Sequence, residues 1–125
     1  MRKTRPKHLN LMQIRLPLPG ILSILHRVSG AGMFLVLPVL LYILQASLAS
    51  ASDFESYKLC LAHPVSKLFL LGMVWAYAHH FCAGIRYLLI DVHCCADLKG
   101  ARISTYVVFA VSLVVTAIVG GCVLW

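Results

Sequence analysis

The stretch TYVVFAVSLVVTAIVGGCVLW, residues 105–125, contains no Asp, Glu, Lys, Arg or His. A helix needs about 20 consecutive, mostly apolar residues to cross the hydrocarbon core of a bilayer. The segment from about Thr105 to Trp125 therefore predicts a membrane-spanning helix. Small residues recur in it at four-residue spacing, which predicts close packing against another helix. They are Ser112, Thr116 and Gly120.

Two earlier segments have the same apolar character, at about residues 65–91 and 21–48. Hydrophobic residues make up 61% of the 125-residue chain and charged residues 12%, whereas a soluble domain carries about 25% charged residues. A chain this short has too little interior to hide that much apolar surface from water, so the lipid bilayer is its expected solvent. The sequence predicts a single all-α domain, an integral membrane bundle of three transmembrane helices.

The segment 1–19 is basic and ends at Pro17 and Pro19, which predict the start of the first helix. A polar loop is expected from Ser50 to Lys58, and a second from His93 to Ser104. Lys and Arg are concentrated before the first span and around the second loop, which predicts a cytoplasmic N-terminus and an external C-terminus. The net charge of +7 does not indicate nucleic-acid binding, because these cations border the spans instead of forming a patch.

His80 is the most informative polar residue inside the spans. It lies roughly 16 Å along the helix axis from Asp91, which places it within the hydrocarbon. An ionisable residue at that depth usually faces a partner or a ligand, and a haem iron is one partner that histidine binds. A hydrogen bond to another helix is the alternative.

His79 is the rival of His80, rotated by about 100° around the helix. Spacing alone does not choose between the two histidines. Gly84, one turn beyond His80 on nearly the same face, leaves room for a flat macrocycle and favours His80. A supporting or helix-packing role is expected for His79.

Ser23, His26, Arg27 and Gly30 share one face of the first span, because their offsets are three, four and seven residues. An arginine fork suits carboxylates such as haem propionates, and a serine with an arginine can bind a quinone carbonyl. The alternative for Arg27 is a side chain that extends to the membrane surface without a ligand. Arg86 and Asp91, at the end of the second span, are expected to be a positive-inside anchor and a solvated acid.

Two stretches resemble the signatures of the succinate dehydrogenase cytochrome b subunit family. Residues 23–30, SILHRVSG, resemble S-x-x-H-R-x-[ST]-G, and residues 80–91, HFCAGIRYLLID, resemble H-x-x-x-G-I-R-H-x-x-x-D. Arg5-Pro6, with the following Asn10-Leu11 and Ile14-Arg15, is also similar. Tyr87 departs from the pattern, which often has a histidine there, and His79 is not part of it.

The resemblance implies a b-type haem shared with a second small membrane subunit. His80 would supply one axial ligand to the haem iron, and His26 and Arg27 would hold the propionates. Ser23 and Arg27 would line a ubiquinone site near the cytoplasmic face. No residue of this chain is expected to be catalytic on its own.

The resemblance also implies an iron–sulfur subunit and a flavoprotein subunit docked on the cytoplasmic side. Electrons from succinate would pass through FAD and iron–sulfur clusters in those subunits to ubiquinone. The expected location is the inner membrane of a bacterium, with the C-terminus in the periplasm. Two alternatives stay open: the anchor of a fumarate reductase, and a haem-free structural subunit or small transporter component.

Overall fold

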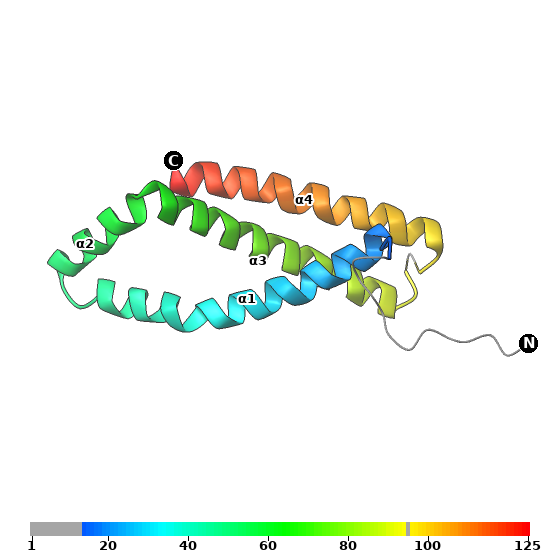
Figure 1. The fold of residues 1–125 in the computed structure, drawn as a ribbon, viewed down its shortest axis with the longest axis horizontal. Helices are drawn as coiled ribbons and strands as arrows, with labels where there is room; N and C mark the ends of the chain where they lie inside the picture. Colours follow the sequence, from blue (N-terminus) through cyan, green and yellow to red (C-terminus); the bar gives the residue numbers. More distant parts are fainter. Residues whose placement is uncertain (1–13, 95) are drawn as a thin grey trace, which may run out of the picture.

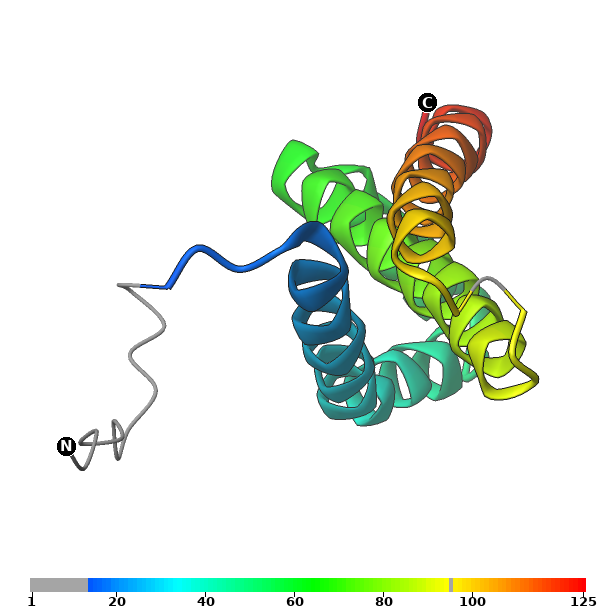
Figure 2. The ribbon, with the colours of Figure 1, turned by 90° about the vertical axis from the view of Figure 1, so that its right-hand side faces the viewer.

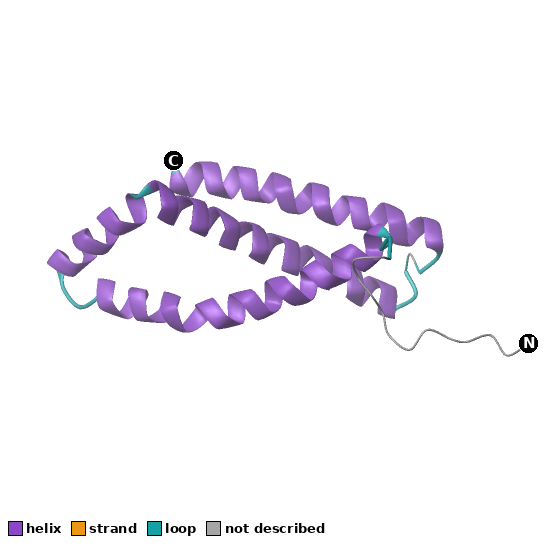
Figure 3. Cartoon of the chain, viewed as in Figure 1, coloured by secondary structure: helices purple, strands orange, loops and turns teal. Residues whose placement is uncertain are grey.

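The structure is a computed structural model that describes residues 14–94 and 96–125. These residues form helices but no strand (Figure 3). Three helices are long and apolar enough to cross a membrane, which confirms the predicted all-α bundle of three spans. They are α1 (Leu18–Ser47), α3 (Pro64–Asp91) and α4 (Leu98–Leu124). Some residues named in the sequence lie outside the described ones. They are the basic cluster Arg2, Lys3, Arg5 and Lys7, the motif residues Arg5-Pro6 and Asn10-Leu11, and Cys95.

The first helix starts where the prolines predict. Pro17 is its extended N-cap and Pro19 lies in the first turn, where a missing N–H costs no helical hydrogen bond. Pro38 lies inside α1 and removes one of its backbone hydrogen bonds. Figure 1 shows α1 bending in its second half, the half that contains this proline.

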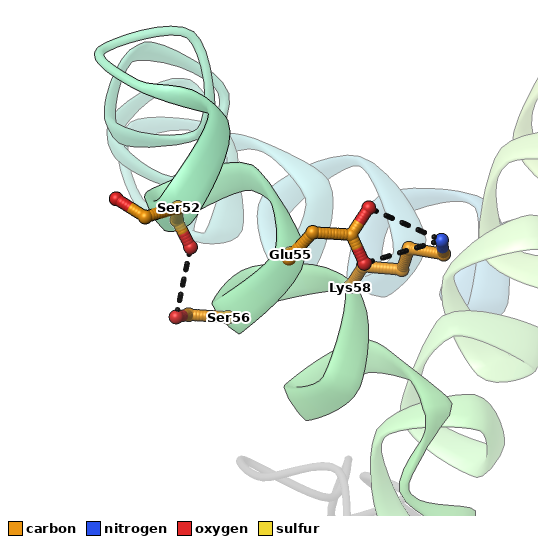
Figure 4. Close-up of polar contacts among 4 residues, drawn as sticks. All are labelled: Ser52, Glu55, Ser56 and Lys58. Atoms are coloured by element: carbon orange, nitrogen blue, oxygen red, sulfur yellow. Dashed lines mark hydrogen bonds and ion pairs between the residues drawn. The ribbon is translucent and has the colours of Figure 1, made fainter.

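The prediction of a polar loop from Ser50 to Lys58 is wrong, because these residues cap and form the 12-residue helix α2 (Ala51–Ala62). The Ser50 hydroxyl accepts the Asp53 N–H at 3.0 Å and donates to the Asp53 carboxylate at 2.7 Å. This serine cap with an acid three residues on is a helix-start signal that hydropathy does not detect. Lys58 pairs with Glu55 at 3.3 Å, and Ser56 donates to the Ser52 carbonyl at 3.0 Å (Figure 4).

The prediction of a loop from His93 to Ser104 is wrong in its second part. α4 begins at Leu98, before the apolar stretch, because the Asp97 carboxylate accepts the Gly100 N–H at 3.3 Å and caps the helix. The preceding helix, α3, ends at Asp91, and His93, two residues later, adopts the left-handed conformation at φ 61°. The Cys94 N–H then reaches the Leu89 carbonyl at 2.8 Å, the bond that closes a Schellman turn.

The three long helices run side by side, and α1 begins at the end of the bundle where α3 ends and α4 begins (Figure 1). In the view along the bundle, α3 lies between α1 and α4 (Figure 2). The row Ser112, Thr116 and Gly120 is buried, and a Cβ on Gly120 would overlap the Leu71 side chain of α3. This confirms the predicted packing role of the small-residue row.

Candidate functional site

The sequence-predicted residues come together where the first half of α1 meets the second half of α3. The imidazole rings of His26 and His80 stack there, with centroids 4.2 Å apart and planes 16° from parallel. Tyr87 extends the group, its ring centroid 5.2 Å from that of His26. Two helices distant in sequence thus bring two histidines and a tyrosine into one cluster.

One nitrogen of His80 is held by α1 and the other is left available. Nδ1 lies 3.0 Å from the main-chain carbonyl oxygen of His26 and 3.4 Å from the Ser29 hydroxyl. A carbonyl oxygen can only accept, so Nδ1 carries the proton of this hydrogen bond, and in the neutral imidazole Nε2 then keeps its lone pair. No described residue forms a hydrogen bond with Nε2. A neutral imidazole with one anchored N–H and one open lone pair is the usual form of a metal-ligating histidine.

The close approach of the helices at this point depends on glycine. A Cβ at Gly30 would lie 2.7 Å from Cε1 of His80, nearer than a real side-chain atom can come. At Gly84, the space beside the backbone is taken by His26, whose Nε2 lies 3.8 Å from the Cβ position. The flat imidazole of His26, and not open space, therefore lies against Gly84. The expectation that Gly84 leaves room for a macrocycle thus gives no reason to prefer His80 over His79.

Ser23 and Arg27 form the polar edge of the cluster. The Arg27 guanidinium donates to the Ser23 hydroxyl at 3.0 Å, one helical turn away. Arg27 is exposed and Ser23 is half-buried, so a hydrogen-bonded serine–arginine pair lies at the surface of α1, next in sequence to His26. Such a pair can bind a carboxylate or a carbonyl oxygen through charge-assisted hydrogen bonds.

An apolar cleft of about 490 Å³ begins about one turn from His80, toward the opposite end of the bundle. Met33 and Leu37 of α1 line it with Met73 and Tyr77 of α3. His80 and Arg27 do not line this cleft themselves. The fit to a haem rests on the chemistry of the cluster, which offers an imidazole nitrogen without a hydrogen-bond partner for the iron and an exposed arginine for the propionates. The residues present therefore fit the group.

His79 lies on a different side of α3 from His80. Its side chain is fully buried between the rings of Trp75, at 5.1 Å, and Phe109 of α4, at 5.4 Å. Neither ring nitrogen has a hydrogen-bond partner among the described residues. His79 thus packs in the α3–α4 contact, in agreement with the helix-packing role expected for it.

Asp91 is exposed, as expected of a solvated acid, whereas Arg86, for which only an anchor role was expected, is buried against α4. Arg86 is only 5% exposed, and its guanidinium donates to the Ser104 hydroxyl at 2.9 Å and the Ala101 carbonyl at 3.2 Å. It also lies 5.2 Å from the ring centroid of Tyr87. The early start of α4, missed in the sequence, supplies both acceptors.

Replacing Arg86 by alanine is expected to lower the free energy of unfolding by about 2 kcal/mol, because two hydrogen bonds from a charged donor are lost and a void is left. Arg102→Ala is the matched control, since Arg102 is exposed and makes no hydrogen bond or ion pair within the described residues. Denaturant titration of both variants in detergent measures the difference. Equal losses in the two variants would show that Arg86 does not tie α3 to α4.

Tyr87 was the departure from the family pattern. Its ring packs against the buried cluster of Leu22, Ala83 and Val108, and its hydroxyl is buried without a partner among the described residues. Residue spacing along one helix does not predict this environment, because the neighbours of Tyr87 come from all three long helices.

Residues 1–119 match the model of a protein family described as "Succinate dehydrogenase/Fumarate reductase transmembrane subunit". A protein of Coxiella burnetii named "Succinate dehydrogenase cytochrome b556 subunit" is 37% identical over 121 residues, covering 96% of this chain and 97% of the relative. Proteins with the same name are 28% identical in Rickettsia felis, covering 90% of this chain and 87% of the relative, and 27% identical in Paracoccus denitrificans, covering 94% and 90%. The family match spans both motif stretches, α1, α3 and most of α4, as far as residue 119.

Proposed function

The chain belongs to the succinate dehydrogenase/fumarate reductase transmembrane subunit family, and from that membership we propose that it is the haem b-binding membrane anchor of a succinate:ubiquinone oxidoreductase, respiratory complex II. The carrying observation is the cluster of His80, His26, Arg27 and Ser23 at one end of the α1–α3 contact. The relatives' shared name supports the succinate-oxidising direction over the fumarate reductase alternative.

His80 is the proposed axial ligand of the haem iron. Its Nε2 lone pair is open while its Nδ1–H is held by the His26 carbonyl. The second axial ligand would come from a second small membrane subunit that shares the haem. When bound, the haem supplies a one-electron carrier in a low-dielectric setting, whose potential depends on the axial ligands and on burial.

His26 and Arg27 are the proposed partners of the haem propionates. Both lie on the first half of α1, and Arg27 is exposed at the polar edge of the cluster. A guanidinium can hold a carboxylate through two parallel N–H donors, which fixes orientation as well as adding energy. The imidazole of His26 is stacked on that of His80, so the proposed propionate partner lies next to the proposed iron ligand.

Ser23 and Arg27 are the proposed donors of the ubiquinone site. The hydrogen bond between them at 3.0 Å holds the guanidinium in place before a substrate arrives. Both groups can donate to a quinone carbonyl oxygen, and the charge of Arg27 favours the more negative oxygen of the reduced form. The chain therefore binds and orients the quinone and stabilises negative charge on it.

The proposed complex has three partners: a second small membrane-anchor subunit, an iron–sulfur subunit and a flavoprotein subunit. The soluble pair would dock on the cytoplasmic side, where α1 begins, and would carry electrons from succinate through FAD and iron–sulfur clusters to ubiquinone. The positive-inside rule supports a cytoplasmic N-terminus and a periplasmic C-terminus in a bacterial inner membrane. The chain has no activity alone.

The test is purification of the tagged full chain in mild detergent, with spectra of the oxidised and succinate-reduced material. We expect two larger partners, a flavin shoulder and a b-type haem signal that responds to succinate. The expected haem content is one per copy of the chain. A colourless preparation of this chain with one small membrane partner and no flavoprotein would contradict the proposal and favour a haem-free structural bundle.

A further inference from the structure

The Nδ1 of His80 meets two acceptors from one turn of α1. The His26 carbonyl oxygen is 3.0 Å away and the Ser29 hydroxyl oxygen 3.4 Å away. The Ser29 hydroxyl donates its own hydrogen to the same His26 carbonyl, at 2.9 Å. Its lone pairs are then free to accept from the imidazole, so the Nδ1–H is shared between two oxygens.

Ser29 is well placed to keep this arrangement fixed. It is 7% exposed, so water competes little for its hydroxyl. Its back-bond to a carbonyl three residues earlier sets the rotamer of the side chain. The orientation of the acceptor is thus built into α1 before any ligand binds.

Gly30, the next residue, sets the distance. A Cβ there would lie 2.7 Å from Cε1 and 3.1 Å from Nδ1 of His80. Any other residue at position 30 would collide with the imidazole, so the ring or the helices would have to shift. Ser29 therefore holds the ring by hydrogen bonding, and Gly30 admits it by lacking a side chain.

We propose that Ser29 and Gly30 are positioning residues for the haem ligand: they fix His80 as its Nδ1–H tautomer, at one rotation, with Nε2 presented to the iron. This inference rests on the proposed haem-binding function. Hydrogen bonding to the distal N–H of a ligating histidine raises the basicity of the ligand. A more basic ligand stabilises ferric iron relative to ferrous iron, so weakening these bonds shifts the haem midpoint potential to more positive values.

The test compares the purified complex carrying Ser29→Ala, Ser29→Thr or Gly30→Ala with the wild type. The measurements are haem content, redox titration of the haem and the low-spin EPR signal. Ser29→Ala is expected to keep its haem with a more positive potential and altered EPR g-values, and Ser29→Thr, which keeps the hydroxyl, to stay near the wild type. Gly30→Ala is expected to give the larger shift or to lose haem.

Two matched controls lie on the same helix. Ser47 donates to the carbonyl three residues earlier, at 2.8 Å, as Ser29 does, but has no contact with His80. A Cβ at Gly32 meets no atom within 4 Å. Ser47→Ala and Gly32→Ala are expected to leave the potential and the EPR signal unchanged.

The outcomes separate this inference from the function on which it rests. A wild-type complex without haem overturns the proposed function, and the wild-type haem count shows this before any variant is compared. A haem-bearing wild type whose Ser29→Ala and Gly30→Ala variants match the two controls in potential and EPR signal overturns the positioning role alone.

Discussion

The complex carrying His80→Ala is expected to lose nearly all of its b-type absorbance, because the chain then offers no imidazole lone pair at the α1–α3 contact in the position of Nε2. The His26 ring does not occupy the position of the His80 ring, because the two rings are stacked face to face with centroids 4.2 Å apart. His26 therefore cannot take over iron binding without moving. The measurement is the reduced-minus-oxidised spectrum, with haem counted per copy of the chain.

His79→Ala is the control for that experiment. The two histidines are adjacent in sequence, but His79 is buried against Trp75 and Phe109 on the α4 side. Its loss is expected to lower stability and to leave the haem spectrum in place. Full haem in His80→Ala together with a lost spectrum in His79→Ala would exchange the two assignments.

Arg27→Leu is expected to slow ubiquinone reduction by succinate by about 10- to 100-fold, the equivalent of the roughly 1.5–3 kcal/mol that a hydrogen bond from a charged donor contributes. Succinate oxidation with an artificial acceptor that takes electrons from the soluble subunits is expected to stay within about twofold, a change worth only about 0.4 kcal/mol. Leucine keeps the apolar stem and removes both the charge and the fork, and the Ser23 hydroxyl loses its donor. The two assays on one preparation give the ratio.

Arg15→Leu and Arg27→Lys sharpen the result. Arg15 is exposed and lies before α1, and so is not on the helix face that carries Ser23 and Arg27. Its loss is expected to leave the ratio of ubiquinone reduction to artificial-acceptor reduction unchanged. Lysine at position 27 keeps the charge but loses the planar fork, so an intermediate rate is expected. Haem content is measured in each variant, because Arg27 is also proposed to hold a propionate. Wild-type quinone reduction by Arg27→Leu would remove this residue from the quinone site.

The three spans could be found in the sequence because lipid imposes a length and a composition on any helix that crosses it. The ends of the helices were less visible. α2 and the first turns of α4 are polar, so hydropathy assigned them to loops, while the Ser50 and Asp97 caps start helices there. Capping is a matter of one side chain and one backbone N–H, and it leaves little trace in an average over many residues.

The sequence also placed Ser23, His26, Arg27 and Gly30 on one face, since helical spacing fixes that geometry within a single helix. It could not place that face against His80, because nothing in the spacing says how two helices rotate and approach. The stacked rings and the shared Nδ1–H acceptors come from that approach. The burial of Arg86 comes from the same cause, through α4.

By itself, therefore, the sequence determined the solvent of the chain, its three apolar spans and the residue types at its site, because these depend on composition and on periodicity along one helix. The tertiary structure alone decided which nitrogen of His80 is held, that His79 packs toward α4, and that Ser29 and Gly30 lie against the His80 ring. These follow from distances between helices, which are set by side-chain packing across the whole α1–α3 and α3–α4 contacts.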